Sequence, residues 1–465
     1  MEDYKIKKKR KFNIKLKPTQ VLVIGFLFVI FLGTILLNLS IASVNGKSVG
    51  VIDAFFTATS SVCVTGLVVV NTMEHWTMFG KTVILILIQI GGLGFMSFTT
   101  ALFIIMGRKI TLKERLVIQE AFNQYTMAGM VRLTKNILIG TFIVEGIGAM
   151  LLAIRFIPEH GIGMGIFMAI FHSVSAFCNA GFDIIGSSSL SPYVSDVLFN
   201  FTIMMLIILG GLGFAVWLNI INVSKDKIEN QYSLKRWFSK LTLHTKLVLV
   251  LTGILILVGF VFFFIVEYNN PDTFENMTLS QKLLAAMFQS VTTRTAGFNT
   301  IPLDKMKDAS KFMTILYMFV GGSPGGTAGG VKTVTVGVIL LTVKSVVEGK
   351  ERTEIFSRSI PTGVIRKAMA VISISLTVVI GVTMLLSLSE SASFMDIFFE
   401  ATSAFATVGL SLGITGNLST FGKIIIAMTM FIGRLGPVTM VAAFTLKGKS
   451  IKTSVKKPEE RVMVG

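Results

Sequence analysis

The most informative segment of the chain reads Phe56-TATSSVCVT-Gly66, a short apolar run that ends in a glycine. The pattern returns three times, as Phe171-HSVSAFCNA-Gly181, Phe288-QSVTTRTA-Gly297 and Phe399-EATSAFATV-Gly409. The four glycines stand 115, 116 and 112 residues apart, a steady period across almost the whole chain. Such a period indicates an internal repeat rather than chance similarity between apolar segments.

A second glycine motif follows each of these runs, and reads Gln89-IGGLGF, Leu209-GGLGF, Val320-GGSPGG and Ile432-GRLGP. Eight longer apolar runs lie near 20–41, 82–106, 136–157, 198–221, 246–267, 312–341, 367–389 and 423–444. About 20 helical residues cross the roughly 30 Å of a hydrocarbon core, whereas the short runs cannot cross alone. We therefore predict an all-α polytopic membrane protein of four pseudo-fourfold helix/pore-loop/helix repeats, with eight transmembrane helices and four re-entrant pore helices.

The repeat divides the chain into four pore units and two tails. We place pore unit 1 at 20–106, unit 2 with its linker at 107–221, unit 3 at 222–341 and unit 4 at 342–444, between tails at 1–19 and 445–465. The first apolar run, 21–37, follows a basic segment and could be taken for a signal peptide. Because its 17 residues exceed the usual apolar core of about 7 to 15, we favour an uncleaved first span.

Charge orients the repeat and narrows the class of protein. Hydrophobic residues make up 52% of the chain and charged residues 15%, which is typical of polytopic membrane proteins. The two tails and the three loops between units hold 32 of the 43 lysines and arginines, so the positive-inside rule predicts cytoplasmic termini. Anionic membrane lipids account for this charge, and no nucleic-acid partner is expected. Two cysteines, Cys63 and Cys178, are too few for a disulfide framework and are expected to be buried thiols.

The four glycine turns have a chemistry of their own. Irregular backbone at membrane depth must be buried in protein or line water. A pore helix that enters from outside also directs its partially negative C-terminus at the membrane centre, which favours a cation there. Glycine permits positive φ, so that successive carbonyls can replace the hydration shell of an ion. The predicted cation filter comprises Val64, Thr65, Gly66, Leu67, Asn179, Ala180, Gly181, Phe182, Thr295, Ala296, Gly297, Phe298, Thr407, Val408, Gly409 and Leu410.

Two qualifications apply to this filter. One glycine per unit, instead of a longer run, predicts fewer ordered ion sites and weaker discrimination among K+, Rb+ and Na+. The alternative is that the glycines serve only close helix packing, as small residues do in membranes.

The third unit is interrupted at 321–330, where six glycines and a proline cannot continue a straight helix. We call this segment the glycine loop. It differs from a nucleotide-binding loop because Val331 separates its last glycine from Lys332 and no strand precedes it. Lys332 and Arg434 lie in membrane helices and need compensation. We expect Arg434 to contact the carbonyls of the glycine loop, and Lys332 either to do the same or to extend toward the cytoplasm.

Other polar residues have less specific interpretations. Asp53 and Asp396 open two pore helices, and Ser280 is expected to cap a third. Glu145 is expected to pair with a neighbouring helix, with ion binding as the alternative. His172 and Glu400 are expected to make contacts behind the filter, and Arg294 to bind the third turn's carbonyls or the dipole of its pore helix.

The four turns, the GGLGF motifs and the GGSPGGTAGGVK segment resemble the Trk/Ktr/HKT superfamily of K+ transporters, most closely its bacterial KtrB branch. The resemblance implies one filter glycine from each unit: Gly66, Gly181, Gly297 and Gly409. Glycine at all four positions goes with K+ selectivity in this family, and serine at the first with Na+ selectivity. The resemblance also implies a gate made of Gly321, Gly322, Ser323, Pro324, Gly325, Gly326, Thr327, Ala328, Gly329, Gly330, Lys332 and Arg434.

On this resemblance we expect the K+ translocating subunit of a Ktr-type uptake system in the bacterial cell membrane. It would be a homodimer docked on a cytosolic ring of KtrA-type nucleotide-binding RCK subunits. K+ would be the transported ion and the only metal bound at the filter, Na+ an activator, and no covalent cofactor is expected. The chain is not expected to be an enzyme. A pore-like subunit of an ATP-driven K+ pump is the alternative.

Overall fold

The computed structural model describes residues 17–94, 98–100, 103, 106, 110–121 and 130–444. The described residues form helices joined by loops, and among them β1 (Glu354–Ile355) and β2 (Arg358–Ser359) form one antiparallel hairpin with Glu354 opposite Ser359. The prediction of an all-α polytopic protein is confirmed. Residues 1–16 and the predicted tail at 445–465 lie outside the described residues.

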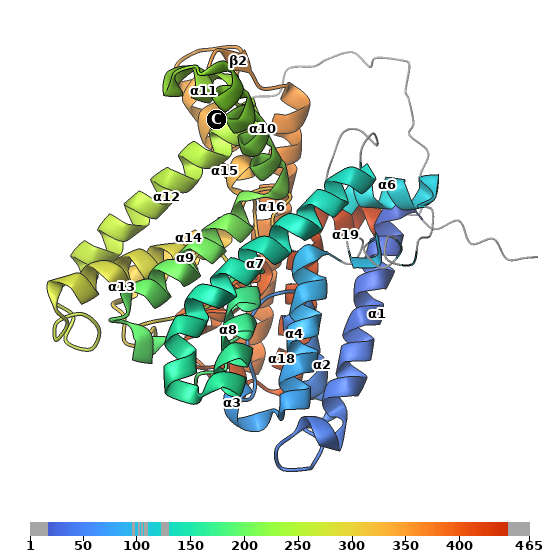
Figure 1. Cartoon of the computed structure of the whole chain (residues 1–465), viewed down its shortest axis with the longest axis vertical. Helices are drawn as coiled ribbons and strands as arrows, with labels where there is room; N and C mark the ends of the chain where they lie inside the picture. The colour runs from blue at the N-terminus through green and yellow to red at the C-terminus, as the bar shows by residue number, and fades with distance from the viewer. Residues whose placement is uncertain are drawn as a thin grey trace, which may run out of the picture.

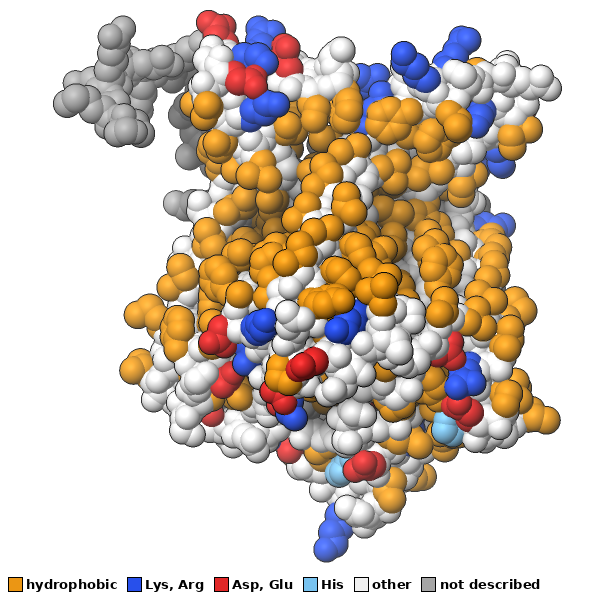
Figure 2. Space-filling view, turned by 90° about the vertical axis from the view of Figure 1, so that its left-hand side faces the viewer, with side chains coloured by type: hydrophobic (Ala, Val, Ile, Leu, Met, Phe, Trp, Pro, Cys, Tyr) orange, Lys and Arg blue, Asp and Glu red, His pale blue; other side chains and the backbone are white. Residues whose placement is uncertain are grey.

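Each repeat begins with a long first helix: α1 (Pro18–Asn38), α7 (Met130–His160), α12 (Leu243–Glu267) and α16 (Thr362–Ser389). Among the described residues, these four helices are each long and apolar enough to cross a membrane. Their outer faces carry exposed Leu, Ile, Val and Phe side chains. Figure 2 shows the result on one face of the molecule, an apolar band with charged side chains gathered beyond it at both ends.

The pore helices are α2 (Val51–Val62), α8 (Ile162–Phe177), α13 (Leu279–Thr292) and α17 (Phe394–Ala406). Their shared phenylalanines, Phe56, Phe171, Phe288 and Phe399, are all fully buried. Asp53 and Asp396 lie in first turns, as expected. The expectation that Ser280 caps this helix is wrong. Thr278 is the N-cap of α13: its hydroxyl accepts from the Gln281 N–H, and the Gln281 side chain accepts from the Thr278 N–H, which makes a capping box.

The second segment of every repeat is broken, although the sequence analysis expected this only in the third. α4 (Met78–Leu93) ends at Gly94, and α9 (Val197–Leu212) turns by 96° at Gly213 into α10 (Phe214–Asn230). α18 (Thr420–Leu435) ends at Gly436 before α19 (Pro437–Phe444). These three glycines all have φ between 81° and 93°, which ends a helix at little steric cost.

In the third repeat the glycine loop separates α14 (Asp308–Phe319) from α15 (Thr333–Val347). The shorter elements are η1 (Ser40–Ala42), α3 (Thr72–His75), α6 (Leu112–Ala121), η2 (Ser191–Tyr193), α11 (Leu234–Lys240) and η3 (Thr415–Asn417). Figure 1 places α10, α11 and the β hairpin at one end of the molecule, and α3 at the opposite end. In the same view α2 and α8 lie nearer the end that carries α3.

Candidate functional site

The four turns after the pore helices have the same backbone conformation. φ is positive at each glycine and also two residues before it, at Val64 (57°), Asn179 (59°), Thr295 (66°) and Thr407 (50°). Non-glycine residues rarely adopt such angles, and a β-branched residue does so only when the surroundings impose it. Alternating left- and right-handed residues allow successive carbonyls to face one side of the chain. The geometry is therefore that of a filter-like strand, repeated four times.

The four glycines meet in a closed ring. A Cβ added to Gly66 would strike the Ala180 carbonyl oxygen and lie 3.1 Å from the Cα of Gly181. The same relation leads from Gly181 to the Ala296 carbonyl, from Gly297 to the Val408 carbonyl, and from Gly409 back to the Thr65 carbonyl. The carbonyl before each glycine therefore lies against the glycine of an adjacent unit. The structure brings the predicted filter residues together around one axis.

Pore-helix hydroxyls support these turns in two different ways. In units 1 and 4, Ser60 and Ser403 accept hydrogen bonds from the N–H groups of Gly66 and Gly409, each at 3.1 Å. In unit 2 the Ser175 hydroxyl donates to the Phe182 carbonyl at 2.6 Å. In unit 3 Thr292 donates to the Phe298 carbonyl at 2.5 Å. The ring is therefore only pseudo-fourfold, since the carbonyls after two of its glycines are bound from behind.

Behind the turns of units 2 and 4, the residue after the shared phenylalanine contacts the chain that leaves the turn. In unit 2, His172 binds the Met168 carbonyl through Nδ1 at 2.7 Å and accepts from the Ile184 N–H through Nε2 at 3.3 Å. In unit 4, Glu400 accepts from the hydroxyls of Ser411 and Thr415 at 2.7 and 2.5 Å. Both residues make the structural contacts that the sequence analysis expected.

The glycine loop, of which no residue is exposed, is held by unit 2. The Ser323 N–H donates to the Gly211 carbonyl at 2.9 Å, and the Phe214 N–H donates to the Gly325 carbonyl at 3.0 Å. Thr327 makes the deepest contact: its N–H donates to Gly210 at 3.1 Å, and its hydroxyl donates to the Phe177 carbonyl at the end of α8 at 3.0 Å. The loop is thereby fixed next to the base of a pore helix.

Arg434 joins three units at this loop. Its guanidinium donates to the Thr327 carbonyl in unit 3 and to the Gly91 and Gly92 carbonyls at the end of α4 in unit 1. Lys332 donates to the Ala328 carbonyl at 2.6 Å, so its ammonium is bound by the loop instead of extending to the cytoplasm. Both predicted cations therefore bind the partially negative backbone carbonyls of the glycine loop, and Arg434 also binds those at the end of α4.

Four further predicted residues have defined positions. Glu145 in α7 accepts from the Gln89 amide of α4 at 3.1 Å, which is the predicted pairing with a neighbouring helix. Cys63 and Cys178 are buried free thiols, as expected. Arg294 Nη2 donates to the Thr252 hydroxyl of α12 at 3.4 Å and not to carbonyls of the third turn, whereas its position just after the C-terminus of α13 leaves the interaction with the dipole of the pore helix as a prediction.

Sequence reasoning missed one set of site residues, the first glycine of each second motif in units 1, 2 and 4. A Cβ on Gly91, Gly210 or Gly433 would strike the carbonyl of Val62, Phe177 or Phe405, each at the end of a pore helix. The signal was present, since these glycines align in the repeat. Their role is to let the second helix approach the base of the turn.

Comparison with known proteins agrees with this geometry. Residues 4–453 match the profile of the TrkH family, described as a cation transport protein. The chain belongs to the TrkH family. It is 43% identical to Ktr system potassium uptake protein B of Bacillus subtilis, over 97% of this chain and 98% of that protein. It is 40% identical to the potassium/sodium uptake protein NtpJ of Enterococcus hirae, over 98% and 99%.

The fold of this TrkH-family chain is also that of a solved structure. The potassium transporter TrkH from Vibrio parahaemolyticus superposes with a TM-score of 0.70 at 18% identity, covering 94% of this chain and 87% of the other. The chain is thus a KtrB-type member of the Trk/Ktr group and a multi-pass membrane protein. It is a transport protein and not an enzyme, in agreement with the sequence analysis.

Proposed function

We propose that the chain is the K+-translocating subunit of a Ktr-type uptake system in the bacterial cell membrane. The observation that carries this proposal is the ring in which each filter glycine lies against the carbonyl before another glycine. Carbonyl oxygens arranged around one axis replace the hydration shell of a monovalent cation. The names of the relatives, which specify potassium uptake, support K+ as that cation.

The glycine loop is the proposed gate. It lies in the membrane part of the chain and is hydrogen-bonded directly to unit 2 and, through Arg434, to units 4 and 1. Glycines give the loop the backbone freedom that a conformational change needs. Lys332 and Arg434 place positive charge beside it, which opposes cation passage while the loop is closed.

The proposed regulatory partner is a cytosolic ring of KtrA-type RCK subunits on a homodimer of this chain, with both termini cytoplasmic. A relative named as part of a Ktr system supports further components, and the name potassium/sodium uptake protein supports a role for Na+. The end with α10, α11 and the β hairpin is the proposed docking end, because its basic side chains include Lys225, Lys235 and Lys240.

This docking end is internally braced. Lys240 of α11 forms an ion pair with Asp226 of α10 at 2.6 Å, and Tyr232 donates to the same carboxylate at 3.0 Å. The hydrogen bond from Lys240 holds the pKa of Asp226 below its usual value. The Lys240 ammonium also lies 4.3 Å from the centre of the Tyr232 ring. A basic surface with a fixed shape suits an acidic partner surface.

K+ uptake by cells that lack their own K+ systems tests the proposal. Wild-type protein, expressed with its cytosolic partner, should restore growth at low K+. Gly66→Ser should lower the ratio of K+ to Na+ uptake by about tenfold, equivalent to about 1.4 kcal/mol, because the new side chain meets the Ala180 carbonyl at a positive φ.

Gly46→Ser provides the matched control, since Gly46 also has a positive φ but faces open space. Its ion selectivity should equal that of wild type. Wild-type rescue with unchanged selectivity in Gly66→Ser would refute the filter, and failure of the wild type to rescue growth would refute K+ translocation.

A further inference from the structure

Asp183 lies two residues after the filter glycine Gly181, where the chain leaves the second turn, a position that we call the exit of a turn. The exits of units 1, 3 and 4 are Val68, Asn299 and Ser411, so one of the four exit side chains is charged. The Cα of Asp183 is at most about 8 Å from that of Gly181, because consecutive Cα atoms are about 3.8 Å apart. Since the filter glycines meet in a ring, one negative charge lies at a mouth of the predicted ion path.

The loop that follows the second turn holds Asp183 at the junction between two units. The Ile185 N–H donates to a carboxylate oxygen of Asp183 at 3.3 Å. The same loop is bound to unit 3, since the Leu190 N–H donates to the Asn299 carbonyl at 3.0 Å and the Asn299 N–H donates to the Ser189 hydroxyl at 3.5 Å. Asn299 is the uncharged exit residue of unit 3. The carboxylate is therefore fixed beside two of the four exits.

The carboxyl group of Asp183 is mostly ionised at neutral pH. Burial raises the pKa of Asp183 to about 6, and hydrogen bonds from the N–H groups of Ile185 and Gly186 and from the Ser189 hydroxyl oppose this rise. Among the described groups that hydrogen-bond to Asp183 there is no cation. Its negative charge is therefore available to act on an ion at the exits.

The other ionisable groups around this loop have partners of their own. His172 of α8 uses one ring nitrogen as a donor and the other as an acceptor for backbone groups, which makes the ring neutral. Tyr193 donates to Glu159 at 2.5 Å, and Glu159 pairs with Arg155. In unit 4, Glu400 is fully buried behind its turn and accepts from two hydroxyl groups. Of these carboxylates, only that of Asp183 belongs to an exit residue.

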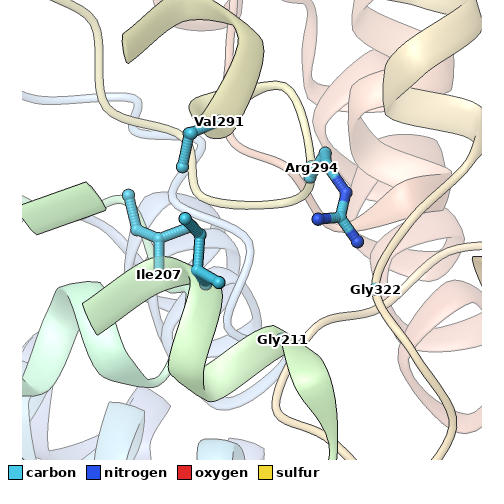
Figure 3. Close-up of a pocket in the computed structure, with 6 residues that line it drawn as sticks. Ile207, Gly211, Val291, Arg294 and Gly322 are labelled. Atoms are coloured by element: carbon cyan, nitrogen blue, oxygen red, sulfur yellow. The ribbon is translucent and has the colours of Figure 1, made fainter. Parts of the chain in front are cut away.

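The opposite side of the filter carries positive charge. The glycine loop contacts the base of a pore helix, at the Phe177 carbonyl, whereas the exits lead away from that base. Figure 3 shows Arg294 projecting from the end of α13 on the side toward Gly322 of this loop. Arg434 and Lys332 bind carbonyls of the same loop. An ion in the filter thus has cationic side chains on the side of the glycine loop and a carboxylate on the side of the exits.

We infer that Asp183 attracts K+ to the outer mouth of the filter and so sets the external K+ concentration at which transport is half-maximal. The inference rests on the proposed function and on the orientation proposed with it. A fixed charge raises the local concentration of every monovalent cation alike, and it leaves discrimination among them to the filter. Added salt weakens such an effect, because the Debye length falls to about 10 Å at 0.1 M.

Initial rates of Rb+ uptake at low ionic strength, into cells that lack their own K+ systems and express the chain with its cytosolic partner, test the inference. Asp183→Asn removes the charge and keeps an oxygen that can accept from the Ile185 N–H. It should raise the half-maximal Rb+ concentration by about threefold, with the maximal rate per protein and the ratio of K+ to Rb+ uptake unchanged. Asp183→Glu, which retains the charge, should stay near the wild type. Asp272→Asn, an exposed residue between α12 and α13 and outside the four exits, is the matched control and should equal the wild type.

External pH and salt distinguish a charge effect from a structural one. Lowering the external pH through about 6 should raise the half-maximal concentration in the wild type and in Asp272→Asn, because protonation removes the negative charge of Asp183. Asp183→Asn should show no such rise, and an added salt of an impermeant organic cation should bring the wild type closer to it.

Two results would overturn the inference while the proposed function stands: an equal half-maximal concentration in wild type and Asp183→Asn, or a changed ratio of K+ to Rb+ uptake in Asp183→Asn. The second result would show that the loop supports the filter structurally. If the wild type takes up neither ion, the proposed function fails and the inference fails with it.

Discussion

Gly433 of α18 shows how a single residue sets the distance between a helix and the filter. Any side chain at this position would strike the Phe405 carbonyl at the end of α17. The final carbonyls of a helix lack partners within it, and here the second helix of the same repeat packs directly over one of them. Gly91 and Gly210 have the same relation to Val62 and Phe177. The close approach places the second motif of these three units directly under the filter.

Gly433→Ala should destabilise the protein by about 1–3 kcal/mol, the usual cost of overpacking a filled core. Thermal unfolding of the purified protein in detergent measures this as a lower midpoint. Gly253→Ala in α12 is the control, because an added Cβ there meets no atom within 4 Å and alanine favours a helix. A midpoint for Gly433→Ala that equals that of Gly253→Ala would contradict the close approach.

At the scale of elements, the glycine loop is held from two sides. Thr327 donates its hydroxyl to unit 2, at the Phe177 carbonyl. Its own carbonyl accepts from Arg434 of unit 4, which also binds Gly91 in unit 1. One residue of the loop is thus connected to all three other units. Movement of the loop must break these bonds together, which makes a change between two discrete positions more favourable than gradual displacement.

Arg434→Ala should raise leak of K+ through the closed protein. Loss of charge-assisted hydrogen bonds worth about 1.5–3 kcal/mol shifts the equilibrium of the loop from closed toward open by roughly 10- to 100-fold. Arg434→Lys should show an intermediate leak, because a lysine cannot bind two groups of carbonyls with a planar fork. Flux of Rb+ in proteoliposomes without a cytosolic partner measures both, and an unchanged leak in Arg434→Ala at equal protein content excludes this role.

The sequence predicted the pore helices but not the breaks in the second segments of units 1, 2 and 4, for physical reasons. The pore helices were found because a period of about 115 residues aligns them and each ends in a glycine. The breaks at Gly94, Gly213 and Gly436 were missed because a single glycine inside an apolar run is often tolerated in a helix. The hydrogen bonds of Arg434 to Gly91 and Gly92 join residues more than 300 positions apart, and the local sequence does not indicate such partners.

At the scale of the whole molecule, four covalently joined units must close into a ring. Three junctions follow chain order, from unit 1 to 2, from 2 to 3 and from 3 to 4, whereas the fourth joins the last unit to the first. At that junction Gly409 lies against the Thr65 carbonyl, and α18 packs against α2. The repeat in the sequence predicts that such a closure exists, but the side chains that form it appear only in the structure.

One ion pair lies at this closing junction. The Lys423 ammonium of α18 is 2.7 Å from an Asp53 carboxylate oxygen in the first turn of α2, with side chains 15% and 25% exposed. Asp53 also lies near the positive end of the α2 dipole, which favours its charge. The pair therefore connects unit 4 to the pore helix of unit 1, 370 residues away in the chain.

A double-mutant cycle measures the contribution of this pair to closure. Asp53→Asn and Lys423→Met should each lower the free energy of unfolding, and the coupling between them should be about 0.5–1 kcal/mol, since both groups remain partly hydrated. Titration with SDS in mixed micelles gives the free energies. Lys240→Met with Asp226→Asn is the control cycle, because that pair lies within one linker and closes no ring.

If the ion pair helps to hold unit 4 against unit 1, selectivity for K+ over Na+ should fall in the variants of the first cycle and remain constant in those of the control cycle. Only the first pair joins the two units that close the ring. Equal selectivity in all variants would show that the filter glycines close the ring without help from this pair.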